Sequence, residues 1–169
     1  MRIGLLADSH DRVPAIAALI DQMVQGGVGL ILHAGDFCSP FSLQPFFEAN
    51  TPMGGVFGRN DGDREGLRAH ASKGVGIELF ESPHSFEVGG KQILLVHDIG
   101  EVAQRSLDSH AVVVHGHSHQ VEMKERGNTL LINPGEACGW LYGAPTAAIL
   151  DLESLSVEIL KLDESRWPT

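Results

Sequence analysis

Short apolar runs that end in clusters of His and Asp recur along this chain, and they constrain its fold more than any other feature. The runs span residues 3–7, 30–32, 93–96 and 111–114, and the clusters that follow them are Asp8-Ser9-His10, Gly35-Asp36, His97 and Gly116-His117-Ser118-His119. Runs of this length are typical of buried strands. Ligands of α/β sheets gather at the carboxyl ends of the strands. The pattern therefore predicts an α/β fold that brings these side chains to one sheet edge.

The order of the predicted elements indicates how the sheets are built. Helical spacing predicts a helix from residue 9 or 11 to Gly26-Gly27, and shorter helices at 41–49, 62–73 and 101–107. Strands are expected at 3–7, 29–34, 53–57, 77–80, 84–88, 91–97, 111–115, 120–126, 129–133, 146–152 and 156–162. Because βαβ units come first and hairpins later, we expect one mixed α/β domain over residues 1–169, with two sheets between helical layers.

Composition limits the partners and the cellular compartment. The net charge of −10, with only 12 Lys and Arg and no basic run, disfavours non-specific binding to nucleic acid. No apolar run approaches the ~20 residues that span a bilayer, and no signal peptide is recognisable. The two cysteines are too few for a disulfide framework. We therefore expect a cytoplasmic protein that does not bind membranes.

The residue types in the clusters point to a metal centre. Asp8 and His10 lie two residues apart, a spacing that places both on one side of an extended segment. His117 and His119 share this spacing, and Asp36 offers a carboxylate that can bridge two ions. Mixed carboxylate and imidazole ligation suits Mn, Fe or Zn rather than Ca or Mg.

One such motif alone is common in proteins, but four at predicted strand ends in one short chain argue against coincidence. The remaining histidines have simpler interpretations. His33 and His115 lie on the strands and are expected to be packed or hydrogen-bonded behind the site. His70, His84 and His110 are expected at the surface or in packing contacts.

The chain resembles the calcineurin-like metallophosphoesterases, most closely their small single-domain phosphodiesterase branch, which includes the retromer scaffold subunit. The motifs that carry the resemblance are Asp8-X-His10, Gly35-Asp36, Gly58-Arg59-Asn60-Asp61, His97, Gly116-His117-Ser118-His119 and Asn133-Pro134-Gly135. The resemblance implies a four-layer αββα sandwich with two mixed β-sheets flanked by helices. It also implies two divalent transition-metal ions, with Mn the first choice and Ni, Co, Fe or Zn the alternatives. By this likeness Asp8, His10 and His119 hold one ion, His97 and His117 hold the other, and Asp36 bridges them.

The chain departs from the family pattern at its third motif. The family has Gly-Asn-X-Asp there, and its Asn binds the second metal. Arg59 occupies that place here, and a guanidinium cannot bind a cation. Three interpretations stay open: Asn60 reaches the metal by a one-residue shift, Arg59 grips a phosphate oxygen, or Arg59 faces solvent. Asp98, where the family usually has Gly, is either a supporting carboxylate or a turn residue.

These observations predict a metal-dependent phosphoesterase that hydrolyses a small phosphodiester with a metal-bridging water. Asp36 and His117 are the predicted catalytic residues, Arg59 and Asn60 are expected to contact substrate, and Asn60 is also a candidate metal ligand. Without the leaving-group histidine that related phosphatases carry at the X position, a phosphomonoesterase is the less favoured enzyme. A protein-interaction scaffold with a vestigial metal site is the alternative from another class. The apolar residues 140–142 also suggest a homo-oligomer.

Overall fold

The computed structural model describes residues 1–163 and contains two mixed β-sheets. The helices are α1 (Val13–Gln25), α2 (Gln44–Ala49), α3 (Arg64–Ala71) and α4 (Gln104–Asp108), with 3₁₀ turns η1 (Pro40–Leu43) and η2 (Ile99–Glu101). The strands are β1 (Arg2–Leu6), β2 (Val28–His33), β3 (Met53–Val56), β4 (Ile77–Phe80), β5 (His84–Val88), β6 (Lys91–Leu95), β7 (Val112–Val114), β8 (Val121–Arg126), β9 (Thr129–Pro134), β10 (Thr146–Asp151) and β11 (Val157–Lys161). The last part of the predicted domain, residues 164–169, lies outside the described residues.

Both sheets contain parallel and antiparallel strand pairs. The first has the strand order β11-β10-β1-β2-β3-β4, in which β1 to β4 run parallel. The second has the order β5-β6-β7-β9-β8, in which β6, β7 and β9 run parallel. All the strands that precede the His and Asp clusters belong to these parallel groups. Their carboxyl ends therefore meet at common edges.

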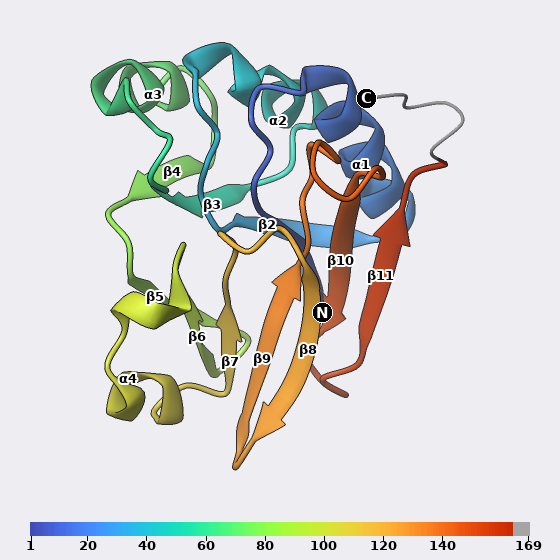
Figure 1. The fold of residues 1–169 in the computed structure, drawn as a ribbon. Coiled ribbons are helices and arrows are strands. Elements are labelled where there is room, and N and C mark those ends of the chain that lie inside the picture. Colours follow the sequence, from blue (N-terminus) through green and yellow to red (C-terminus); the bar gives the residue numbers. More distant parts are fainter. Residues whose placement is uncertain (164–169) are drawn as a thin grey trace.

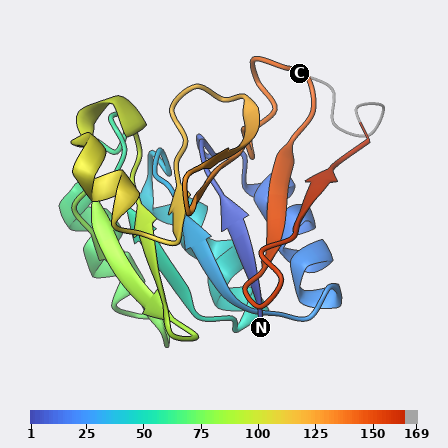
Figure 2. The same cartoon turned by 90° about the horizontal axis from the view of Figure 1, so that it is seen from below.

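Three apolar layers hold the elements together (Figures 1 and 2). The first packs α1, α2 and α3 against the outer face of the first sheet, and it includes Ile16, Leu19 and Phe46. The second fills the space between the sheets, where Leu5 and Val114 contribute from opposite sides. The third lies between the second sheet and α4. The predicted αββα sandwich is confirmed, because helices cover the outer faces of two stacked sheets.

The short helices differ most from the sequence expectation. The helix predicted over 41–49 divides into η1 and α2, each with a Pro in its first turn. Since a proline ring fixes φ and lacks an N–H, it starts a helical turn more readily than it continues one. The helix predicted over 101–107 is also split, into η2 and α4, although residues 99–108 contain no Pro.

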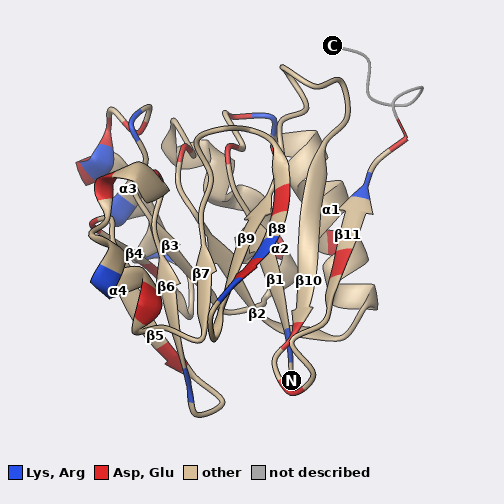
Figure 3. Cartoon of the chain, turned by 60° about the horizontal axis from the view of Figure 1, so that its bottom comes forward, with Lys and Arg blue, Asp and Glu red and all other residues tan. Residues whose placement is uncertain are grey.

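Charged residues are spread along the chain (Figure 3). Lys and Arg residues occur singly or beside acidic residues, as on β8, where Glu122, Lys124, Glu125 and Arg126 share one strand. Within the described residues no helix is long and apolar enough to cross a membrane.

Candidate metal centre

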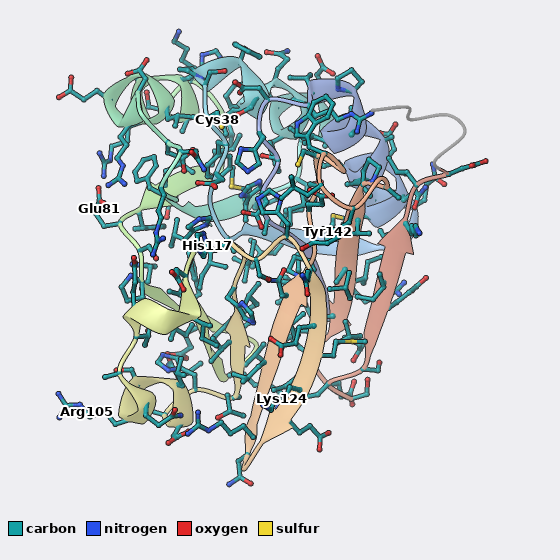
Figure 4. The ribbon with its side chains drawn as sticks, in the orientation of Figure 1. Cys38, Glu81, Arg105, His117, Lys124 and Tyr142 are labelled. Atoms are coloured by element: carbon teal, nitrogen blue, oxygen red, sulfur yellow. The ribbon has the colours of Figure 1, made fainter. Side chains whose placement is uncertain are left out.

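The predicted ligands come from loops that directly follow parallel strands of both sheets. Asp8 and His10 follow β1, Asp36 follows β2, and His97 follows β6. His117 and His119 follow β7. Figure 4 shows His117 in the same region as Cys38 and Tyr142, which belong to two other loops. The two stacked sheets thus deliver residues separated by more than 100 positions to one place.

The backbone at these ligands is unusual. The φ angles are 51° at Asp8, 38° at His10, 61° at Asp36, 69° at His117 and 62° at His119, all in the left-handed region. Non-glycine residues seldom adopt this conformation, and strained backbone of this kind clusters at functional sites. The expectation that Asp8 and His10 share a side of an extended segment is therefore wrong. A tight turn, not an extended chain, brings the two side chains together.

Asp36 lies at the centre of the cluster. Its Oδ2 atom is 3.5 Å from Nε2 of His10 and 3.5 Å from Nε2 of His97. Asn60 donates to Asp36 twice, from its backbone N to Oδ1 at 2.8 Å and from Nδ2 to Oδ2 at 2.7 Å. Burial opposes ionisation of Asp36, but these hydrogen bonds and the two imidazoles outweigh it and lower its pKa. Asp36 is therefore an ionised carboxylate between two imidazoles.

One set of donor atoms converges closely enough to hold an ion. Atoms of Asp8, His10, Asp36 and His119 all lie within 4.8 Å of one another. Nε2 of His10 is 3.3 Å from Nε2 of His119, and Oδ1 of Asp8 is 3.8 Å from the same His119 atom. Burial raises the pKa of Asp8 to about 6 and lowers the pKa of His10, so each group is disfavoured in its charged form without a partner.

Hydrogen bonds on the far side of two rings turn their free nitrogens toward this centre. His97 Nδ1 donates to the backbone oxygen of Ala34 at 2.8 Å, and His119 Nδ1 donates to Oε2 of Glu136 at 2.8 Å. Each Nε2 then carries a lone pair, as metal-binding imidazoles require.

The unpaired atoms also favour a cation. Asp8 Oδ2 and His97 Nε2 are buried and have no hydrogen-bond partner among the described residues. Buried polar atoms are seldom left this way unless a ligand or an ion satisfies them. The donor types, their convergence and these orphaned atoms fit divalent metal ions. The assignment of individual residues to two ions stays a prediction.

The outer part of the site contains His117 and the departure from the family motif. His117 Nε2 is 3.6 Å from Oδ2 of Asp98 and 3.4 Å from Nη1 of Arg59. Arg59 is half exposed and pairs with Asp98 at 2.5 Å and with Glu101 at 2.8 Å. Asp98 also accepts from the backbone N of Gly100 and so begins η2. Asp98 is thus a turn residue whose carboxylate also pairs with Arg59, and the Arg59 guanidinium is held between two carboxylates.

Sequence reasoning gave no role to two carboxylates that support the site. Glu136 fixes the His119 ring, and Asp61 accepts from the backbone N atoms of Asp36, Cys38 and Gly58 at 3.1, 2.8 and 2.6 Å. Asp61 ends the Gly58-Arg59-Asn60-Asp61 motif, and Glu136 directly follows Asn133-Pro134-Gly135. These positions beside family motifs were the only signal that the sequence offered for the two carboxylates. Glu136 also belongs to a second convergent group with His119 and Cys138.

The remaining histidines lie where the sequence placed them. His33 and His115 are buried behind the site, and His33 Nε2 donates to Ser9 Oγ at 3.0 Å. His70 and His84 pack against Phe47 and Phe80 respectively, and His110 bonds to Ser85 at 2.8 Å. Both cysteines are free thiols.

His33 is expected to make the metal-free protein acid-sensitive. Complete burial lowers its pKa from 6.5 to about 3, and its Nδ1 accepts from the Gly35 N–H, where an added proton would clash. Because the pKa of His33 is lower in the folded than in the unfolded protein, only the unfolded state takes up a proton as the pH falls below 6.5. The free energy of unfolding is therefore highest above pH 6.5 and decreases as the pH falls from 6.5 toward 3. The loss should approach ~1.4 kcal/mol per pH unit.

The measurement is urea unfolding at pH 6, 5 and 4 in chelator, comparing the wild type with His33→Gln. The raised pKa of Asp8 acts in the opposite direction, so the difference between the two proteins isolates His33. Parallel stability profiles would contradict the prediction.

Comparisons with known proteins agree with this fold. Residues 1–155 match the model of the calcineurin-like phosphoesterase superfamily domain. The phosphodiesterase MJ0936 of Methanocaldococcus jannaschii is 33% identical over 157 residues, which cover 90% of this chain and 94% of that protein.

Two solved structures share the fold. That of an archaeal phosphodiesterase superposes with a TM-score of 0.86 at 31% identity, covering 96% of this chain and 100% of the other. Vps29 of Entamoeba histolytica, as a single mutant, superposes with a TM-score of 0.67 at 19% identity over 96% of this chain and 100% of its own, a likeness of fold alone. From the family match, the sequence relationship and the αββα fold, we conclude that this chain belongs to the calcineurin-like phosphoesterase superfamily.

Proposed function

We propose that this chain is a metal-dependent phosphodiesterase, which hydrolyses small phosphodiesters at a centre of two divalent ions with Mn as the first choice. The observation that carries the proposal is the position of Asp36, whose Oδ2 is 3.5 Å from Nε2 of both His10 and His97. One carboxylate between two imidazoles is the arrangement that a bridging ligand needs. The name of the relative MJ0936, a phosphodiesterase, supports the reaction class.

The family resemblance assigns a role to each side chain, and the contacts of Asp36 and Asn60 support it. Asp8, His10 and His119 would hold one ion, His97 and His117 the other, and Asp36 both. When bound, the two ions would polarise the phosphoryl oxygens and lower the pKa of the attacking water. Asn60 orients Asp36 through its two hydrogen bonds and keeps the carboxylate ionised.

The reaction ends with departure of an alcohol. Water adds to phosphorus and releases a proton to solvent, the ester P–O bond breaks, and its electron pair leaves with the alkoxide, which must gain a proton to become the alcohol. Asn60, at the X position of the third motif, has no acidic proton to donate. Protonation therefore comes from solvent water, which favours diesters with good leaving groups.

The test is hydrolysis of bis-p-nitrophenyl phosphate by protein loaded with Mn, before and after treatment with EDTA. We expect turnover that EDTA abolishes and Mn restores, with slower hydrolysis of the monoester p-nitrophenyl phosphate. Absence of turnover with each of Mn, Ni, Co and Zn would contradict the proposal. Elemental analysis of the same protein separates it from a scaffold with a vestigial site, which should carry little metal.

Arg59→Asn is expected to strengthen binding of the second ion. The change removes a cation 3.4 Å from His117 Nε2 and restores the Gly-Asn-X-Asp pattern, so repulsion falls and one donor is gained. Calorimetric titration with Mn should show a stoichiometry closer to two per chain. Arg126→Asn is the matched control, because Arg126 also pairs with a carboxylate, Asp108 at 3.6 Å, but lies on β8 outside the centre. Equal titrations for Arg59→Asn and the wild type would contradict the prediction.

The same variant tests whether Arg59 also grips substrate. In that case Arg59→Asn should raise the Michaelis constant for the diester while the metal stoichiometry rises. Steady-state kinetics at saturating Mn gives this readout separately from the titration.

A further inference from the structure

A cavity of about 460 Å³ opens beside the candidate metal centre at His119. Its walls include the apolar side chains of Val121, Ala144 and Ile159 and the ring of Tyr142. The other groups that line it are polar: Gln120, Glu136, Thr146 and Lys161. Walls that combine apolar side chains with placed polar groups, at a volume within ~300–1,000 Å³, are typical of sites for small organic groups.

The cavity is fixed in position relative to the metal centre. The carboxylate of Glu136 accepts from His119 Nδ1 at 2.8 Å and also from the backbone N of Leu141 at 3.0 Å and of Tyr142 at 2.5 Å. Gln120 Nε2 donates to the hydroxyl of Tyr142 at 2.5 Å and holds the other end of that residue. One carboxylate thus connects a candidate metal ligand with the aromatic wall, which Figure 4 shows on the loop beside the centre.

A second cavity reaches the centre at His97 and differs in character. It has a volume of about 210 Å³ and is lined by charged side chains, among them Arg59, Arg64, Glu81 and Glu101. Arg64 pairs with Glu81 at 2.8 Å, and Arg59 pairs with Glu101 at 2.8 Å. The spaces beside His119 and His97 therefore suit unlike chemical groups.

We propose that the cavity at His119 binds one ester arm of the substrate and selects arms that carry a flat aromatic or heteroaromatic ring. The inference rests on the proposed phosphodiesterase function. Tyr142 is 55% exposed, so a ring placed against it covers aromatic surface that is open in the free protein. Ring-on-ring contact adds to the burial of apolar area, whereas a methyl or glycerol arm leaves most of the cavity to water.

The experiment is calorimetric titration of Mn-loaded protein with phenylphosphonate and with methylphosphonate, neither of which can be hydrolysed. We expect phenylphosphonate to bind at least tenfold more tightly. In Tyr142→Ala this ratio should fall toward one. In Met123→Ala it should stay at the wild-type value, because Met123 is similarly exposed, at 51%, but lies on β8 outside the cavity.

The outcomes separate the two proposals. Equal binding of the two phosphonates, or a ratio unchanged in Tyr142→Ala, overturns the ring pocket even when bis-p-nitrophenyl phosphate is hydrolysed. Absence of diester turnover overturns the proposed function whatever the phosphonates do. Thymidine 5′-monophosphate identifies the source of the ring: tighter binding than phenylphosphonate assigns a nucleoside arm, and weaker binding assigns a simple aryl arm. Either ranking supports the pocket, provided that Tyr142→Ala weakens the binding of the ring-bearing ligand that binds more tightly.

Discussion

Asp36→Asn is expected to lower diester turnover by at least about a hundredfold, which corresponds to ~2.7 kcal/mol in the activation free energy. The carboxylate is the group nearest to imidazoles of both predicted ion positions, with its Oδ2 3.5 Å from His10 and from His97. The amide removes the negative charge and replaces one acceptor oxygen by a donor. A single change therefore weakens both ion positions together.

The fold should survive this substitution, so the loss can be assigned to chemistry. Circular dichroism and thermal unfolding in chelator should remain close to those of the wild type. Asp21→Asn is the matched control, because Asp21 is exposed on α1 and belongs to none of the loops that carry the predicted ligands. Retention of more than about a tenth of the wild-type activity by Asp36→Asn, only ~1.4 kcal/mol, is too small an effect for a bridging ligand.

Metal binding is expected to stabilise the protein strongly. A ligand that binds only the folded state at one hundred times its Kd adds ~2.7 kcal/mol per site. For a chain of this size, each kcal/mol raises Tm by roughly 2–4 °C, so one filled site should raise Tm by about 5–10 °C. The physical reason is local: a cation would satisfy the buried Asp8 Oδ2 and His97 Nε2, which have no hydrogen-bond partner among the described residues.

Thermal scans with EDTA, Mn and Mg measure this effect. Mg should give a smaller shift than Mn, since it prefers oxygen ligands and the cluster contains several imidazoles. The Asp36→Asn variant should lose most of the Mn-dependent shift. Equal Tm values in EDTA and in excess Mn would contradict the predicted centre.

Most of the fold could be predicted because its signals are local. The buried runs of β1, β2, β6 and β7 are short and apolar, and Gly89-Gly90 and Gly127-Asn128 mark hairpin turns. The sandwich followed from βαβ units before hairpins, together with the resemblance of the motifs to the family. The split of 41–49 into η1 and α2 was missed because the effect of Pro45 depends on where the preceding turn ends.

The candidate site was predictable in its residues but less so in its geometry. Strand ends identified Asp8, Asp36 and His97. Asp and His adopt the left-handed conformation more often than most residues, but too rarely for residue type alone to predict it at Asp8 and His10. The role of Glu136 depends on a contact with His119, a residue from another strand end. Such contacts arise from tertiary packing and have no periodicity that a sequence could reveal.

The side-chain partners of Arg59 also could not be predicted from the sequence. Its place in the third motif raised the question of a lost metal ligand, but Asp98 and Glu101 lie 39 and 42 positions away in sequence. Only the fold brings these carboxylates to the guanidinium. The pairing explains how a cation is accommodated beside His117, and it makes Arg59→Asn an informative variant.

The most direct test of the metal centre is anomalous X-ray diffraction from crystals soaked in Mn. Two peaks should lie on either side of the Asp36 carboxylate, one bound by Asp8, His10 and His119 and the other by His97 and His117. No peak at Asp36, or a single ion held by Glu136 and Cys138 in the second convergent group with His119, would contradict the account.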